Sequence, residues 1–163
     1  TVFLGESTLN LNDRDRAVLT DENLQAAPDV WAAGDIARYP ADGATERIEH
    51  WRVAQQHGIL AARAMLGRPE PVESRVPFFW TKQWSTSLRY VGHAAKWDEI
   101  IVRGDIAPEG KFIAYYIAGG KLVAAAGVGF DTQIAALNLL MRENRTPSIE
   151  QLRDPSLEIT IGN

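Results

Sequence analysis

The chain has 163 residues, of which 45% are hydrophobic and 23% charged, with a formal net charge of −4 and no cysteine. These proportions are ordinary for a globular protein of one large domain or two small ones. The absence of cysteine excludes disulfides and zinc–thiolate sites and fits a reducing compartment, for which we expect the cytoplasm. The negative charge argues against a nucleic-acid partner, and no apolar stretch reaches the length of a membrane span.

The first region, residues 1–73, has the pattern of short strands followed by a helix. Two strands, a loop and a long helix are predicted in it, at 17–19, 29–33, 40–45 and 48–66. The helix is expected to end near Leu66 because Gly67 and Pro69 are typical stop signals. This pattern indicates part of an α/β layer, and the chain is expected to begin within a domain.

The second region, residues 74–163, has the pattern of strands and then helices. Four strands and two helices are predicted, at 88–92, 99–103, 112–118, 121–130, 131–142 and just after Ser148. Gly119-Gly120 is typical of a two-residue hairpin turn, and Ser148 with Gln151 is a capping-box pattern. Asp131 or Thr132 is expected to cap the first helix. The order predicts an antiparallel sheet with helices on one face, so the fold class is α+β.

The strongest local signal for a ligand site is Val30-Trp31-Ala32-Ala33-Gly34-Asp35, an apolar strand that ends in Gly and Asp. Glycine lets a ligand approach the backbone closely, and an aspartate at the carboxyl end of a strand lies where open α/β sheets bind ligands. Its carboxylate can accept hydrogen bonds from polyol hydroxyls. The alternative is a plain turn that binds nothing.

The predicted start of the long helix carries Arg47-Ile48-Glu49-His50-Trp51. Helix N-termini expose free N–H groups and partial positive charge, which can stabilise a negatively charged ligand group. The alternatives are an exposed histidine without a ligand at position 50 and a core tryptophan at position 51. An aromatic segment, Val76–Trp84, opens the second region, and Phe78, Phe79 and Trp84 are expected in its core.

These segments together resemble a known family. Residues 28–37 are similar to the second FAD motif of flavoproteins with two dinucleotide-binding domains, and residues 18–25 resemble the strand and turn before it. The runs at 47–51 and 76–84 resemble the FAD-dependent NAD(P)H oxidoreductases of the ferredoxin-reductase and apoptosis-inducing-factor type. The resemblance covers nearly the whole chain.

The resemblance implies a role for each candidate site residue. Asp35, next to Gly34, would bind the ribityl chain of FAD. Glu49 and His50 would face the nicotinamide, and His50 with Trp51 the flavin. Trp80 would reach across the domain boundary to cover the flavin ring, and Trp84 is a weaker candidate for that role. No side chain is needed as a catalytic acid or base, and no metal site is expected.

The resemblance also implies a partial FAD-binding α/β region in residues 1–73 and a C-terminal reductase domain, an antiparallel sheet plus two helices, in residues 74–163. No GxGxxG fingerprint occurs in the sequence, so FAD and NAD(P)H binding would need a region before Thr1. The expected function is electron transfer from NAD(P)H through FAD to a ferredoxin- or Rieske-type iron–sulfur acceptor, in a homodimer without nucleic acid or membrane. The alternatives are a non-catalytic assembly module and a protein that kept the fold but lost the cofactor.

Overall fold

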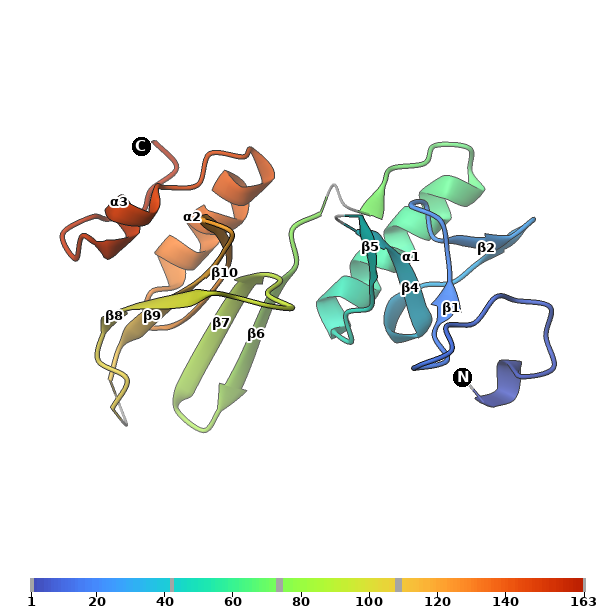
Figure 1. Cartoon of the computed structure of the whole chain (residues 1–163), viewed down its shortest axis with the longest axis horizontal. Coiled ribbons are helices and arrows are strands. Elements are labelled where there is room, and N and C mark those ends of the chain that lie inside the picture. Colours follow the sequence, from blue (N-terminus) through green and yellow to red (C-terminus); the bar gives the residue numbers. More distant parts are fainter. Residues whose placement is uncertain (1, 42, 73–74, 108–109, 163) are drawn as a thin grey trace. The chain divides into compact units, whose positions relative to one another are not determined.

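The computed structural model describes residues 2–41, 43–72, 75–107 and 110–162 of the chain. The chain divides into two compact units, Thr1–Arg75 and Val76–Asn163, and each has its own hydrophobic core (Figure 1). The predicted domain boundary between residues 73 and 74 falls outside the described residues.

The first unit consists of short strands, two 3₁₀ turns and one long helix. They are η1 (Val2–Leu4), β1 (Val18–Leu19), β2 (Gln25–Ala27), β3 (Val30–Trp31), η2 (Gly34–Ile36), β4 (Ala37–Ala41), β5 (Ala44–Glu46) and α1 (Trp51–Met65). The predicted helix starts three residues later than expected, because His50 is the N-cap residue and has an extended backbone, with φ −155° and ψ 120°.

The prediction of a loop at 40–45 was wrong, because most of these residues belong to a β-hairpin. β4 pairs with β5 in antiparallel fashion and with β1 in parallel fashion. The side chains of β4 alternate, so that Ala37, Tyr39 and Ala41 are buried while Pro40 points to solvent. The local proline and glycine signals hid this period-two pattern, and a proline is tolerated at such an exposed strand position. Asp42, which the predicted loop also included, lies outside the described residues.

The helix α1 covers the core of the first unit with one side. Val53, His57, Leu60 and Ala61 are buried along it, with the spacing of a single helical face. Leu60 and Ala61 pack in the same cluster as Tyr39. This packing brings the amino-terminal half of α1 next to η2.

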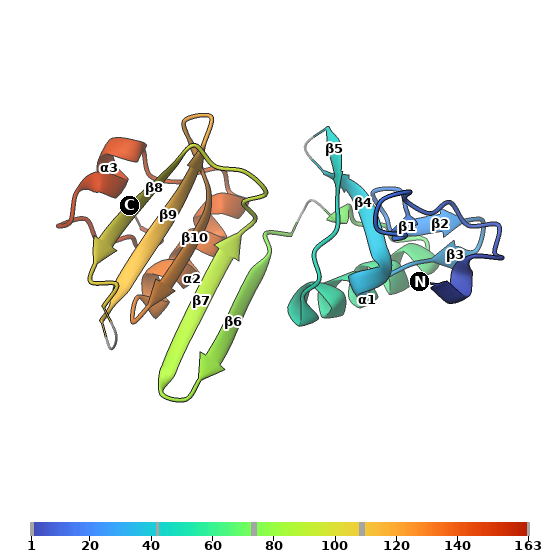
Figure 2. The ribbon, with the colours of Figure 1, turned by 60° about the horizontal axis from the view of Figure 1, so that its bottom comes forward.

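The second unit is a five-stranded antiparallel sheet with two helices. Its elements are β6 (Phe78–Gln83), β7 (Thr86–Gly92), β8 (Glu99–Gly104), β9 (Phe112–Ala118), β10 (Lys121–Val128), α2 (Asp131–Arg142) and α3 (Ile149–Arg153). The strand order is β6-β7-β10-β9-β8, as Figure 2 shows. The prediction of four strands was wrong by one: the aromatic segment forms the edge strand β6, which pairs with β7 from Phe78↔Val91 to Gln83↔Thr86.

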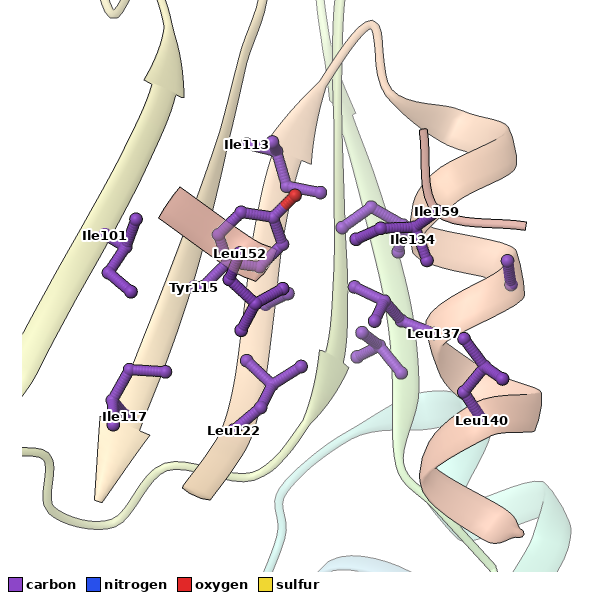
Figure 3. Packing of buried hydrophobic residues seen from close by; sticks show 13 residues of the cluster. Ile101, Ile113, Tyr115, Ile117, Leu122, Ile134, Leu137, Leu140, Leu152 and Ile159 are labelled. Carbon is purple, nitrogen blue, oxygen red and sulfur yellow. The ribbon is translucent and has the colours of Figure 1, made fainter. Parts of the chain in front are cut away.

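The core of the second unit lies between one face of this sheet and the helices (Figure 3). Its members come from the sheet, from α2, from α3 and from the segment after α3, among them Ile113, Tyr115, Leu137, Leu152 and Ile159. This arrangement confirms the predicted α+β class.

The predicted turn and caps of the second unit have different outcomes. Gly119 and Gly120 join β9 to β10 with positive φ, and Ser148 forms the predicted capping box with Gln151. The predicted cap of α2 was wrong, because the N-cap residue is Phe130. Asp131 instead forms an ion pair with Arg89 of β7, and its negative charge suits the first turn of a helix.

Candidate functional site

The Gly34–Asp35 turn begins two residues after the end of β3 and packs against α1. Gly34 has φ +77°, and a Cβ atom added there would lie 3.1 Å from the Cβ atom of Ala54. The backbone N–H of Gly34 donates to Nδ1 of His57 over 3.2 Å. Position 34 therefore suits glycine for two reasons, the left-handed backbone and the closeness of the helix. The side chain of the next residue, Asp35, is exposed.

Arg47 joins this turn to the segment that precedes α1. Its Nε atom donates to the backbone carbonyl oxygen of Asp35 over 2.6 Å. Its Nη2 atom forms an ion pair with Glu49, and its Nη1 atom lies 3.5 Å from Oδ2 of Asp15. The carboxylate of Asp15 also accepts from Nη2 of Arg38 at 2.5 Å. The two arginines thus hold the turn, β4 and the start of α1 in one polar network.

The network shifts the pKa of Asp15. The hydrogen bond from Arg38 lowers the pKa of this carboxyl to about 2, helped by the backbone N–H of Ala17 and by the charge of Arg47. Burial acts in the opposite direction. Asp15 therefore stays negative at neutral pH and keeps both arginines in place.

His50 is the residue before the first turn of α1. Burial lowers the pKa of its imidazole, and the charge of Arg52 acts in the same direction, whereas the negative charge of Asp35 raises it. A neutral imidazole is therefore favoured at neutral pH. The N–H groups of the first helical turn begin at this residue.

Trp51 and Glu49 flank His50 and are both exposed. Trp51 is not a core residue of the first unit, so the interpretation of this position as ordinary core is wrong. An exposed indole at a helix start is a large apolar surface beside the polar Asp35 turn, which suits a flat ligand with a polar tail.

Trp80 belongs to the second unit. It lies on the edge strand β6, opposite Arg89 of β7, and 39% of its surface is exposed. Its ring centroid is 6.3 Å from that of Phe78, which packs against the core. Trp84 was expected in the core, but it lies in the β6–β7 turn with φ +51° and is 94% exposed. A hairpin turn at this position leaves a side chain nothing to pack against.

The structure therefore brings five of the six predicted residues into the first unit, around η2 and the start of α1: Gly34, Asp35, Glu49, His50 and Trp51. Trp80 stands in the other unit. Sequence reasoning gave no role to Arg47 or His57. The i, i+3 spacing of Ala54 and His57 on a predicted helix is the one sequence signal that both face the same neighbour.

Comparison with known proteins identifies the family. The family model described as reductase C-terminal matches residues 78–160, which is half of the chain. The chain belongs to the reductase C-terminal family. This match, with the relatives below, confirms the relationship to ferredoxin reductases and apoptosis-inducing factors that the sequence motifs predicted.

The match to relatives extends beyond the reductase C-terminal domain into the first unit of the chain. The chain is 32% identical to human apoptosis-inducing factor 3 over 148 residues, which is 89% of the chain and 24% of that protein. It is 31% identical over 149 residues to the ferredoxin–NAD(+) reductase component of the anthranilate 1,2-dioxygenase system of Burkholderia cepacia, covering 89% of the chain and 36% of that protein. The chain thus spans well under half the length of these relatives.

Solved structures match the fold of this reductase C-terminal chain. A ferredoxin reductase from Rhodopseudomonas palustris has a TM-score of 0.82 at 25% identity, covering 93% of the chain and 37% of that protein. A chain of the covalent putidaredoxin reductase–putidaredoxin complex has a TM-score of 0.81 at 26% identity, with coverage of 93% and 36%.

The residues of the first unit fit the flavin nucleotide that this family implies. Gly34 lets the turn lie close to α1, Asp35 presents an exposed carboxylate, and His50 and Trp51 stand at the start of the helix that packs against this turn. Within the described parts of the chain, no cluster of acidic, histidine or cysteine residues could hold a metal ion. None of the described helices is both long and apolar enough to cross a membrane.

Proposed function

We propose that this chain is the flavin-contacting C-terminal part of a cytoplasmic NAD(P)H oxidoreductase that delivers electrons to a ferredoxin- or Rieske-type iron–sulfur acceptor. The carrying observation is the Gly34–Asp35 turn held against the start of α1 by Arg47 and His57. The names of relatives support the activity: one is a ferredoxin–NAD(+) reductase component, and another structure holds a reductase covalently joined to putidaredoxin.

Each site residue has a distinct task in this proposal. Asp35 accepts hydrogen bonds from the ribityl hydroxyls of FAD, and Gly34 lets the turn pack closely against Ala54 of α1, which sets the position of Asp35. The N–H groups at the tip of α1, next to His50 and Trp51, stabilise negative charge on the pyrimidine side of the ring. Glu49 and His50 border the nicotinamide.

Trp80 supplies an aromatic face that shields the ring system, for which an indole is a suitable neighbour. FAD, when bound, would accept a hydride from NAD(P)H and supply electrons to the iron–sulfur acceptor. The chain's own residues bind, orient and shield, and no side chain acts as a catalytic acid or base.

The domain roles follow from this proposal. Residues 1–73 form the C-terminal part of an FAD-binding domain, and residues 74–163 form the reductase C-terminal domain with a role in contacts between subunits of a homodimer. The fingerprints for FAD pyrophosphate and NAD(P)H belong to a region of the flavoprotein outside this chain, since the sequence contains no GxGxxG.

The test of the proposal is flavin content. Asp35→Ala in the complete flavoprotein removes the acceptor for the ribityl hydroxyls. The affinity for FAD should therefore fall at least about tenfold, and less FAD should remain bound after purification. The control is Asp29→Asn, which removes an exposed carboxylate just before β3 and keeps a residue type that tolerates the left-handed backbone there, with φ +59°. Flavin absorbance per protein that stays the same in Asp35→Ala and in the control contradicts the proposal.

A second candidate function is a non-catalytic assembly module. The observation that favours it is that the second unit has its own core yet exposes large apolar side chains, notably Trp84, Trp97 and Ile106. Exposed apolar surface favours association between proteins. Sedimentation of the chain with and without flavin separates the two functions: a colourless dimer supports assembly, and a yellow species supports flavin binding.

A further inference from the structure

His57 is a buried histidine for which the proposed electron transfer has no use. It lies on the core-facing side of α1 and is 1% exposed. Its Nδ1 atom accepts a hydrogen bond from the backbone N–H of Gly34, which lies 23 positions earlier in the chain. A buried N–H group costs free energy unless an acceptor faces it, so the imidazole stabilises the particular backbone conformation of the turn.

Two residues of α1, one helical turn apart, contact Gly34. Ala54 closes on the α-carbon side of Gly34, at 3.1 Å from the position of a built Cβ atom. His57, three residues further along the same face of α1, holds the N–H group. The turn conformation, with φ +77° at Gly34, thus depends on contacts from α1.

The hydrogen bond requires a neutral imidazole with its proton on Nε2, because Nδ1 must offer a lone pair. A second proton would sit on Nδ1 and face the Gly34 N–H, so two donors would oppose each other. Tyr39 of β4 packs its ring against His57 at 5.0 Å between centroids and 87° between planes. Among the described residues, Nε2 has no hydrogen-bond partner.

The charges around His57 favour the neutral form on balance. Burial lowers the pKa of the imidazole to about 4, and the negative charge of Asp35 on η2 opposes this shift. Tyr39, the titratable group that faces it from β4, is neutral at physiological pH because burial raises its pKa. The hydrogen bond to Gly34 is therefore intact at neutral pH and weakens in acid.

We propose that neutral His57 is the positioning residue that fixes the Gly34–Asp35 turn for FAD, and that protonation of its imidazole releases this turn. The inference rests on the proposed function for its FAD half, while the hydrogen bond itself concerns this chain alone. His57→Gln keeps an acceptor that does not titrate, and His57→Leu removes the acceptor at similar volume. His93→Gln, in the second unit, is the matched control for loss of a histidine.

The first arm measures the hydrogen bond in the labelled chain by nuclear magnetic resonance. We expect a through-bond coupling between Gly34 N and His57 Nδ1, lost as the pH falls below the pKa of about 4. Solvent exchange of the Gly34 N–H should be at least about tenfold faster in His57→Leu and nearly unchanged in His57→Gln and His93→Gln. If His57→Leu does not fold, the coupling and the pH dependence of the unchanged chain against His57→Gln decide.

The second arm measures FAD affinity of the complete flavoprotein over the same pH range. The wild-type affinity should fall as His57 becomes protonated, whereas that of His57→Gln should lack this step. Absence of the coupling, or equal exchange in all variants, overturns the inference. If the coupling is present, and FAD affinity falls in Asp35→Ala but is the same in wild type and the His57 variants, only the positioning role is overturned. FAD affinity unchanged in Asp35→Ala overturns the proposed function, and the first arm still decides the hydrogen bond.

Discussion

Arg47 donates from Nε to the backbone carbonyl oxygen of Asp35 over 2.6 Å, while its Nη atoms meet the carboxylates of Asp15 and Glu49. One guanidinium thereby gives the backbone carbonyl of Asp35 a hydrogen-bond donor and connects this residue to the segment that begins α1. The planar fork of arginine allows these contacts at once, which lysine cannot reproduce.

The first prediction concerns this guanidinium. Arg47→Met should lower the free energy of unfolding by about 2 kcal/mol, because the Asp35 carbonyl and the Asp15 carboxylate each lose a charged donor. Arg47→Lys should keep the charge but recover only part of the loss. Urea unfolding checks this, with exposed Arg68→Met as the control. A loss no larger than that of Arg68→Met would show that the network adds nothing to stability.

The second prediction is a stability step in mild acid from His57. Its pKa is lowered from 6.5 to about 4 in the folded chain. Between these values the unfolded chain binds a proton that the folded chain does not. The contribution of His57 to the free energy of unfolding is therefore fully present above pH 6.5 and decreases as the pH falls. The slope is about 1.4 kcal/mol per pH unit, and the contribution is fully lost near pH 4.

Unfolding of His57→Gln over the same pH range checks this step. The variant should show a much smaller slope, and what remains belongs to His50, whose pKa burial also lowers. An unchanged slope in His57→Gln would assign the acid sensitivity to other groups.

The third prediction separates Asp15 from the histidines by pH. The pKa of this carboxyl is lowered from 3.8 to about 2, so its contribution is present above pH 3.8 and is lost as the pH falls towards 2. Asp15→Asn should remove about 2 kcal/mol at neutral pH and also remove this late acid step. Acid unfolding monitored by circular dichroism measures both effects. A late step that persists in Asp15→Asn contradicts the assignment.

Much of the second unit could be predicted from the sequence because its signals are local. The Gly119-Gly120 turn and the capping box from Ser148 to Gln151 each depend on a few adjacent residues, and both appear where expected. The edge strand β6 could not be predicted in the same way. Its six residues gain their extended form from pairing with β7, and at a sheet edge their burial does not alternate.

The candidate site shows the same division. The Gly34–Asp35 motif was found from consecutive residues, but its support comes from Arg47 and His57, which are 12 and 23 positions away from their partners. A histidine in a helix gives no sequence signal that its Nδ1 atom will accept a particular N–H group. Only the packing of α1 on η2 creates that contact.

The fourth prediction concerns the buried Arg103 of β8, which is 9% exposed. Its Nη2 atom donates to the carbonyl oxygens of Pro155 and Leu157, at 3.0 and 2.6 Å, and its Nη1 atom to the hydroxyl of Tyr115 at 3.3 Å. The side chain therefore fastens the segment after α3 to the sheet. Arg103→Met should cost about 3 kcal/mol, because buried acceptors lose charged donors.

Hydrogen exchange and urea unfolding check the role of Arg103. Protection of the Ile159 amide, in this segment, and of the Leu152 amide, in the adjoining α3, should decrease in Arg103→Met, since the segment loses its anchor. Arg142→Met, at the exposed end of α2, should change neither quantity. Equal behaviour of the two variants would show that the apolar contacts of Leu152 and Ile159 hold the segment without the guanidinium.

The last prediction concerns the point where β7 meets β10. Gly92 has φ +80°, and a Cβ atom there would lie 2.2 Å from the carbonyl oxygen of Val123 and 2.9 Å from the Cα atom of Ala124. Both are backbone atoms of a central strand, so they cannot move aside without breaking strand pairing. Gly92→Ala should therefore cost more than about 3 kcal/mol of unfolding free energy, combining backbone strain with the clash.

Gly119→Ala separates the clash from the strain. Gly119 also has a positive φ, of +55°, but no atom lies within 4 Å of a Cβ built there. This variant should cost only about 1–2 kcal/mol, the penalty for a left-handed alanine. Thermal and urea unfolding of both variants give the difference, which reports the clash alone. Similar losses at the two positions would mean that β10 can shift away from β7, and that the sheet is less rigid at this crossing than its register indicates.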